Sequence, residues 1–346
     1  MNSAALGYWY SMRRSDLPSF IPRSPLRAYL QRPRNMRQHP KTTRGFEHLK
    51  FADVPEEFMD ATGYSLADYS VAIGHVTHEN PLRFEIFGSG VLVQKGKRCG
   101  LLTAHHCVHG PDAPEFRFGS FDGDKLVMVL KRSHLVVLPP EILVKHDLGI
   151  PTADGEPDLA FVEFLASPQL GAVRAVSSFW SLDRDFGKIA TEFGQFGMPF
   201  TVIGFPGTYH QTKREGNIVR KIIKHMAFFY AIRPKGIFSA RGWDYVEATN
   251  RYDQGNELPP TFHGVSGGPV WGLKIKREKQ SGRLILNDFA LLGIAISQIR
   301  ASKKALRVRA HFIRSIYELA WLNLNGLSCK PAGKICERVS FSRPSK

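Results

Sequence analysis

Three histidines and a cysteine lie within five consecutive residues of the chain. The segment Leu101 to Gly110 reads LLTAHHCVHG and contains His105, His106, Cys107 and His109. His105 and His109 have the i, i+4 spacing that places two side chains on one helical face, as in a metal site. Alternatively, one histidine is a catalytic base, because the pKa of imidazole lies near neutrality. No second group of ligands completes a tetrahedral site, so the sequence predicts no metal centre.

A serine stands among glycines in the segment His263 to Trp271, which reads HGVSGGPVW. Glycines allow the backbone to turn sharply and allow a substrate to approach it closely. The backbone N–H groups of Gly264 and Ser266 are candidates for an oxyanion hole, which stabilises the tetrahedral intermediate of acyl transfer. The alternative is a glycine-rich loop with an incidental serine.

A serine hydroxyl is a weak nucleophile that needs a base, and the base in turn needs a carboxylate to orient it. Asp158 begins the apolar segment DLAFVEF, so its carboxylate is expected at the end of a β-strand. Asp147 and Asp154 are the alternatives, but neither is followed by an alternating apolar strand. The sequence therefore favours Asp158 as the partner of a catalytic histidine.

These segments resemble three boxes of the chymotrypsin/trypsin-like serine peptidases, including bacterial and HtrA-like members. TAHHC is similar to their TAAHC box, DLAFVEF to their D-I-A-L strand and GVSGGP to their GDSGGP box. The segments GSGVLV (88–93) and FPG (205–207) also match, and the order His, Asp, Ser is that of this family. The resemblance covers residues 68–300.

The resemblance implies a serine endopeptidase that acts on proteins through an acyl-enzyme and needs no cofactor. It assigns the triad to His106, which directly precedes the cysteine of its box, with Asp158 and Ser266. His105 is expected at a packing or rim position, and His109 is expected to be exposed one turn further on. A non-catalytic binding module on the same fold is the main alternative function.

The sequence departs from the family pattern at two positions that bear on activation and compartment. Val265 stands where digestive and clotting proteases carry an aspartate, and valine cannot accept the salt bridge from a new N-terminal ammonium that activates those enzymes. Activation through a buried amine is therefore not expected. Cys107 lacks a partner at the family's usual distance upstream, because Cys99 is only eight residues away.

The candidate substrate-binding residues are taken from the family's specificity position and from its substrate-binding strand. Pro260 stands six residues before Ser266, where trypsin-type enzymes place an aspartate for basic side chains. The segment LLGIAIS, residues 291–297, resembles the substrate-binding strand, and it favours a small or medium apolar side chain. The further candidates for substrate contact are Ile296, Ser297 and His263.

Short β-strands are the elements expected to position these residues. From Ser70 onward, short apolar runs alternate with Gly, Pro and charged residues, which is typical of an all-β protein. With the resemblance, this predicts two antiparallel six-stranded β-barrels. Apolar residues at helical spacing predict a C-terminal helix over Arg307 to Leu324, and PEEFMDATGYSLADY predicts a short helix before the strands. Residues 166–195 are expected to form a surface linker.

The expected organisation has four parts. It consists of a basic N-terminal extension (1–65), a first barrel with His106 and Asp158 (66–180), a second barrel with Ser266 and the closing helix (181–325), and a basic tail (326–346).

The net charge of +16 is concentrated at the two ends of the chain. Residues 1–50 hold ten Lys and Arg against two Asp and Glu, and residues 301–346 repeat that count. Solvated tails are the simplest interpretation, and an anionic partner such as nucleic acid is the alternative. The four cysteines and the absence of a signal-peptide pattern predict a reducing, cytoplasmic setting, and no apolar run is long enough for a transmembrane helix.

Overall fold

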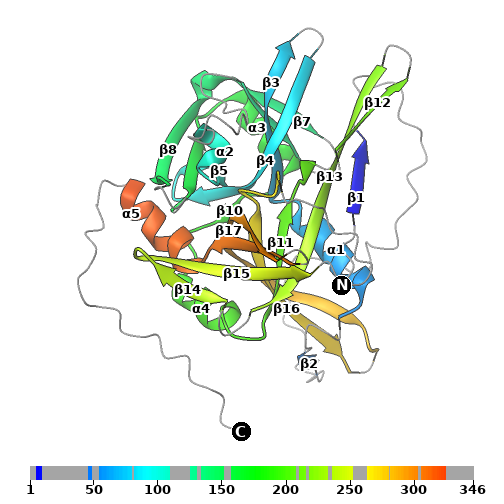
Figure 1. Cartoon of the computed structure of the whole chain (residues 1–346), viewed down its shortest axis with the longest axis vertical. Helices are drawn as coiled ribbons and strands as arrows, with labels where there is room; N and C mark the ends of the chain where they lie inside the picture. Colours follow the sequence, from blue (N-terminus) through cyan, green and yellow to red (C-terminus); the bar gives the residue numbers. More distant parts are fainter. Residues whose placement is uncertain are drawn as a thin grey trace, which may run out of the picture.

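The chain folds mainly as β-strands, which form two sheets (Figure 1). The structure is a computed structural model, and it describes residues 5–9, 46–48, 54–79, 82–109, 125–130, 134–151, 157–207, 210–215, 218–232, 236–251, 263–279, 281–302 and 305–324. Figure 1 shows most of the first sheet in the upper part of the view and most of the second in the lower part.

The first sheet is built from strands that lie between residues 70 and 181. Its order is β7, β6, β3, β4, β5, β9 and β8, with antiparallel pairing throughout, and the short β10 runs parallel to β4. The bounds are β3 (Ser70–Glu79), β4 (Leu82–Lys95), β5 (Arg98–Thr103), β6 (Leu126–Val129), β7 (Leu135–Leu138), β8 (Leu143–Gly149), β9 (Leu159–Phe164) and β10 (Trp180–Ser181).

The second sheet is antiparallel and uses strands from the later part of the chain and two short early ones. Its order is β1, β13, β11, β16, β17, β18, β15 and β14, while β12 pairs with β13 and β2 pairs with β16. The bounds are β1 (Ala5–Trp9), β2 (Phe46–His48), β11 (Pro199–Gly204), β12 (Gln211–Glu215), β13 (Ile218–Ala231), β14 (Ile237–Ala240), β15 (Trp243–Arg251), β16 (Pro269–Glu278), β17 (Leu284–Ser302) and β18 (Ala305–His311).

The strand pairings leave both sheets open in the described part of the chain. No pairing there joins β7 to β8 or β1 to β14, which are the outer strands of the two paths. The antiparallel β architecture is therefore confirmed, and closure into two six-stranded barrels stays a prediction.

The helices are short, and the longest in the described part of the chain has 11 residues. The expected helix before the strands is present as α1 (Glu56–Leu66). The others are α2 (His106–His109), the 3₁₀-helix η4 (Pro140–Ile142), α3 (Pro168–Val176), α4 (Phe186–Phe193), the π-helix η6 (Ser315–Leu319) and α5 (Ala320–Leu324).

Residues 166–195 are not a simple surface linker, because they contain α3 and α4. Each helix begins with a capping side chain whose oxygen accepts a hydrogen bond from the first turn. Ser167 Oγ accepts from the N–H of Leu170 at 3.1 Å, and Asp185 Oδ1 accepts from the N–H of Lys188 at 3.2 Å. Such caps satisfy N–H groups that have no partner within the helix, which explains where both helices start.

The helix expected to begin at Arg307 begins later, because residues 305–311 form β18. In this strand alternate residues such as Val308 are buried, whereas Arg307 and Arg309 reach Glu247 on the neighbouring β15. The two guanidinium groups lie 3.1 and 2.7 Å from its carboxylate and lower the pKa of Glu247 despite its partial burial. This alternation has the period of a strand, and the cross-strand ion pairs favour the strand over a helix.

The C-terminal helical segment starts where Asp244 caps it. The Asp244 carboxylate accepts hydrogen bonds from the N–H groups of Arg314 at 3.0 Å and Ser315 at 2.6 Å. Burial raises the pKa of this carboxyl, although the bonds from the Ser315 hydroxyl and from the backbone act in the opposite direction. The predicted helical stripe is thus confirmed only for the residues after β18.

Aromatic side chains fill the core between the two sheets. Trp180 of the first sheet and Trp271 of the second meet edge to face, with ring centroids 5.1 Å apart, and Tyr69 and Phe289 contact both. The Trp180 indole N–H donates to the Tyr317 hydroxyl at 2.7 Å, and this hydroxyl donates to a carbonyl of β17 at 3.0 Å. The two sheets and the C-terminal helical segment therefore share one core.

Candidate active site

The antiparallel pairing of β5 with β9 brings His106 and Asp158 together. Thr103 at the end of β5 is opposite Ala160 near the start of β9, so the residues that follow β5 and precede β9 lie at the same edge. Asp158 is buried, and its two oxygens accept from His106: Oδ1 lies 2.9 Å from the backbone N, and Oδ2 lies 2.5 Å from ring Nδ1. Two bonds from one carboxylate fix both the position and the orientation of the imidazole.

The environment of His106 favours the charged form of its ring. Burial disfavours the imidazolium, but the neighbouring Cys107 sulfur and the Asp158 carboxylate outweigh this effect and raise the pKa of His106 well above its ordinary value. Asp158 therefore stabilises the imidazolium that forms when the ring takes up a proton, but the ring has to be neutral before it can act as a base, so the raised pKa moves the base-competent form of His106 to higher pH.

The loop between β15 and β16 that carries Ser266 is attached to the first sheet through Ser89 of β4. The Ser89 backbone N–H donates to the carbonyl of Ser266 at 2.8 Å, and its hydroxyl donates to the carbonyl of Gly264. The same hydroxyl accepts from the N–H of Phe205 at 3.0 Å, and Thr103 donates to the Ser89 carbonyl at 2.7 Å. One buried serine therefore fixes the loop on both sides of the candidate nucleophile.

Two glycines of this loop adopt a conformation that other residues avoid. Gly264 has a φ of 90° and Gly267 a φ of 82°. A Cβ on Gly264 would lie 2.4 Å from the carbonyl oxygen of Phe205, and one on Gly267 would lie 2.0 Å from that of Ser89. Both positions therefore require glycine for space as well as for φ.

Ser266 lies beside the residue that follows His106. The Cys107 thiol donates to the carbonyl of Ser266 at 3.5 Å, and the Ser266 side chain is half-buried. Among the described residues, no hydrogen bond uses the N–H of Gly264 or of Ser266. The predicted oxyanion donors are thus available to a ligand in the described part of the chain.

His311 is a buried neighbour of Asp158 that the sequence analysis missed, because it was assigned to a helix. Its Nε2 accepts the backbone N–H of Asp158 at 3.3 Å, and its ring lies between Trp243 and Tyr245, with centroid distances of 5.0 and 4.9 Å. Burial lowers the pKa of His311 from 6.5 to about 3, although the Asp158 carboxylate acts in the opposite direction. The neutral ring supports the backbone from which Asp158 reaches His106.

Acid is expected to destabilise the fold through His311. Between pH 6.5 and 3 the unfolded chain binds a proton at this histidine and the folded chain does not, so the free energy of unfolding falls as the pH falls. From pH 7 to pH 5 this loss is about 2 kcal/mol. Denaturant unfolding across this range should show a shallower pH dependence for His311→Gln than for wild type, with the exposed His134→Gln as control. Equal slopes for all three proteins would contradict this role.

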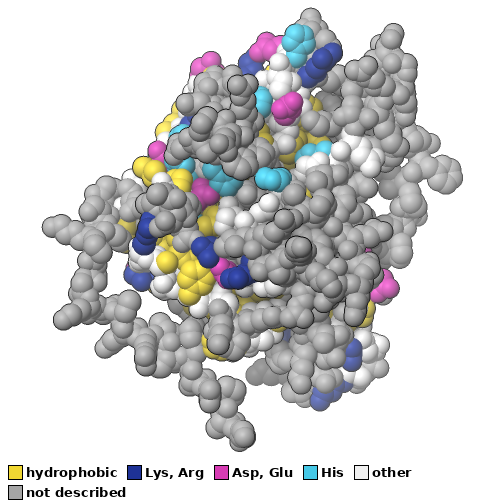
Figure 2. Space-filling view, viewed as in Figure 1, with side chains coloured by type: hydrophobic (Ala, Val, Ile, Leu, Met, Phe, Trp, Pro, Cys, Tyr) yellow, Lys and Arg dark blue, Asp and Glu magenta, His cyan; other side chains and the backbone are white. Residues whose placement is uncertain are grey.

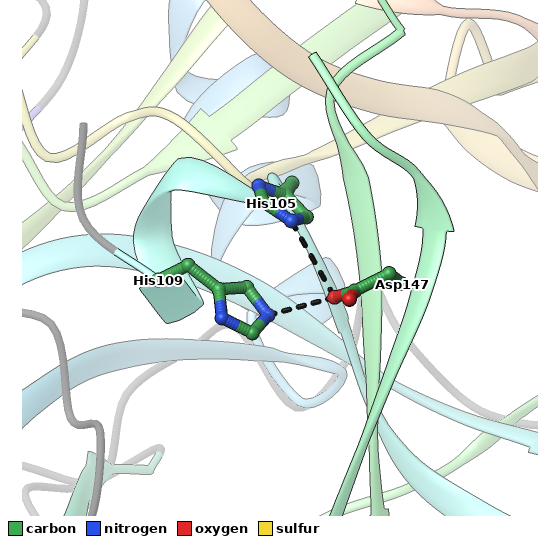
Figure 3. A group of neighbouring side chains, drawn as sticks. All are labelled: His105, His109 and Asp147. Carbon is green, nitrogen blue, oxygen red and sulfur yellow. Dashed lines mark ion pairs between the residues drawn. The ribbon is translucent and has the colours of Figure 1, made fainter. Parts of the chain in front are cut away.

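His105, His109 and Asp147 form a cluster that the sequence analysis did not predict (Figure 3). His105 is partly buried, as a packing or rim position predicts, whereas His109 is less exposed than expected. Both rings lie at Asp147, which had been considered only as a triad acid. Asp147 Oδ1 is 3.4 Å from His105 Nε2 and 2.7 Å from His109 Nε2. Among the described residues, Asp147 pairs with His105 and His109, whereas His106 pairs with Asp158. The spacing of the two histidines was visible in the sequence, but the carboxylate comes from β8.

The predicted substrate-contact residues are described in part. Ile296 is buried within β17, and Ser297 beside it is half-buried and pairs with Arg309 of β18. His263 is exposed, and its carbonyl accepts from the N–H of Gly207 at 2.9 Å. Pro260 and the alternative acid Asp154 lie outside the described residues, as do most of the two basic ends.

Two observations bear on the expected setting of the protein. Cys99 and Cys107 are buried free thiols, and the other two cysteines lie outside the described residues. In the part of the chain that the structure describes, every helix is too short or too polar to cross a lipid bilayer.

A comparison of the chain with models of known protein families and with curated proteins gave no match.

Proposed function

We propose that the chain is a serine endopeptidase with a trypsin-like arrangement of His106, Asp158 and Ser266. The observation that carries the proposal is the meeting of three segments far apart in the sequence. The His106 ring bonds to Asp158 at 2.5 Å, and the Ser266 carbonyl accepts from the thiol of the residue next to His106. A hydroxyl, an imidazole and a carboxylate in this order form the usual machinery of acyl transfer.

In the proposed mechanism, Ser266 Oγ attacks the carbonyl carbon of a peptide bond while His106 Nε2 accepts its proton. Asp158 keeps the other proton of the imidazole on Nδ1 and stabilises the imidazolium. The N–H groups of Gly264 and Ser266 bind the negative oxygen of the tetrahedral intermediate. His106 then protonates the leaving amine, and water releases the acyl group from Ser266. These steps need no cofactor.

The proposal also covers the domain architecture and the cellular compartment of the protein. Two barrels, residues 66–180 and 181–325, with the site between them, fit the two antiparallel sheets and the bridge that Ser89 makes to the loop of Ser266. The basic tail, residues 326–346, is proposed as a solvated extension of a cytoplasmic enzyme, whereas the N-terminal part, residues 1–65, packs into the core through Val54, Phe58 and Met59 of its last segment. Binding of an anionic partner by the basic ends is the alternative.

For the substrate, the proposal is a protein chain with a small or medium apolar side chain before the cleaved bond. The buried Ile296 and the half-buried Ser297 of β17 support an apolar binding strand. Val265, which takes the position of the activating aspartate, is also buried, and a Cβ on Gly204 would lie 2.8 Å from it. This close contact supports activation without a buried terminal ammonium.

A fluorophosphonate probe tests the proposal directly, because it reacts only with an activated serine. We expect one probe molecule per chain in wild type, located at Ser266 by peptide mass spectrometry, and none in Ser266→Ala. The matched control Ser239→Ala, which changes an exposed serine of β14, should be labelled like wild type. A wild-type chain that is folded and remains unlabelled would contradict the proposal and favour a non-catalytic binding module.

A further inference from the structure

The helical turn that carries His106 presents two other histidines to a carboxylate on the first sheet. The backbone N–H of His109 donates to the carbonyl of His105 at 3.1 Å, so the two residues lie one helical turn apart on the same face. Their rings are stacked, with centroids 4.4 Å apart and an angle of 24° between the planes. Figure 3 shows both rings directed toward Asp147 of β8.

We infer that His105, His109 and Asp147 form a binding site for a zinc ion. The three ligand atoms lie within 4.8 Å of one another. Two donors of a tetrahedral zinc ion, each about 2.1 Å from the metal, are separated by about 3.4 Å. The distance between His105 Nε2 and Asp147 Oδ1 is 3.4 Å. The distance between His109 Nε2 and the same oxygen is 2.7 Å, and it has to increase by about 0.7 Å when a zinc ion replaces the proton between the two atoms.

The chemistry of the ligands favours a transition-metal ion such as zinc over magnesium and calcium. Two imidazoles and one carboxylate suit zinc, whereas magnesium and calcium prefer oxygen ligands alone. Three protein ligands leave the fourth tetrahedral position for water. The Asp147 side chain is 41% exposed and His109 29%, so an ion can reach the site from solvent.

The neighbouring histidine of β8 is not part of this site. His146 Nε2 lies 2.9 Å from Glu163 of β9, and its ring stacks on Phe161. Adjacent residues of a strand point to opposite faces, which separates His146 from Asp147. Figure 2 has the same view as Figure 1, and its histidine side chains gather in the region where Figure 1 shows the first sheet. Selective binding therefore has to be tested against other histidines.

The proposed site is separate from the candidate catalytic residues, although it shares α2 with them. His106 uses its backbone N–H and its Nδ1 for Asp158, and neither atom belongs to the zinc ligands. A zinc ion would join α2 to β8 and so fasten the turn that holds His106. The inference does not depend on peptidase activity.

Zinc chloride titrated into the full chain after chelation and buffer exchange tests the inference. We expect one zinc ion per chain by calorimetry and by elemental analysis, and an increase in Tm, because the ion binds the folded chain. His109→Ala and Asp147→Asn should raise the Kd for zinc at least about tenfold. His134→Ala, which removes an exposed histidine outside the cluster, should keep the wild-type Kd.

Asp147→Asn keeps the shape of the side chain, so it decides the outcome if His109→Ala does not fold. The inference is overturned if wild type shows no saturable zinc binding, or if Asp147→Asn binds zinc with the wild-type Kd, which would place the metal at thiols or at other histidines. Since zinc content is measured rather than hydrolysis, a failure here is distinct from a failure of probe labelling at Ser266.

Discussion

Peptide hydrolysis by the Ser266→Ala variant is expected to be about 10⁶-fold slower in kcat than by wild type. Without the hydroxyl no acyl-enzyme can form, and the remaining rate comes from the oxyanion donors and from substrate binding alone. The measurement is the initial rate of cleavage of a peptide library, which also identifies the preferred side chain. The fold should not change, because no hydrogen bond among the described residues uses the Ser266 hydroxyl.

The control for this prediction is Ser239→Ala, which should cleave the library at the wild-type rate. Thermal unfolding of both variants must give Tm values close to wild type, so that a lost rate reports chemistry and not folding. If Ser266→Ala keeps more than about a tenth of the wild-type kcat, the nucleophile is another group and the proposed mechanism is wrong.

The Asp158→Asn variant is expected to lower kcat by about 10⁴-fold. The amide has nearly the shape of the carboxylate, but it is uncharged and has only one oxygen that can accept a hydrogen bond. It therefore cannot replace both bonds that Asp158 accepts from the backbone N–H and the ring of His106. The imidazole then loses both its fixed tautomer and the charge that stabilises the imidazolium. Rates measured together with Tm separate this effect from a loss of stability.

Asp288→Asn is the matched control for Asp158→Asn, because it changes an exposed aspartate of β17. It should leave kcat within a factor of about two. Asp147→Asn provides the sharper comparison, since Asp147 was the alternative acid in the sequence. A large loss of kcat in Asp147→Asn together with a normal rate in Asp158→Asn would reverse the assignment of the two carboxylates.

Local patterns in the sequence predicted the β architecture and placed Asp158 at the end of a strand, whereas the choice of His106 as its partner came from the resemblance to the serine peptidases. Short apolar runs separated by turn residues are sufficient to indicate strands, and an aspartate directly before such a run lies at a strand end. The contact between the two residues then follows from the pairing of β5 with β9. The order of strands in the sheets depends on long-range contacts that no local pattern contains.

The errors have specific physical causes. The predicted helix included residues 307–311, although its apolar stripe begins only at Phe312. In the structure these residues belong to β18, where Arg307 and Arg309 form ion pairs with Glu247 across the strand pair. The caps Ser167 and Asp185 were visible signals for α3 and α4 that the linker interpretation overlooked.

Three contacts at the candidate sites could not be predicted from local patterns in the sequence. Ser89 is a buried polar residue of β4, and its partners come from loops more than a hundred residues away. His311 meets Asp158 only through the packing of β18 against the first sheet. Asp147 joins the two histidines because β8 happens to pass beside α2, which no spacing in the sequence encodes.

The attachment of the Ser266 loop to Ser89 has a consequence for the newly made chain. The carbonyls on both sides of the candidate nucleophile are held by a residue of the other sheet, so the loop has no complete support until both halves have docked. The proposed peptidase activity would then arise only after the two sheets have packed together. Unfolded segments are the easiest substrates for cleavage. A newly made chain would therefore be unable to cleave itself or neighbouring chains before it has folded.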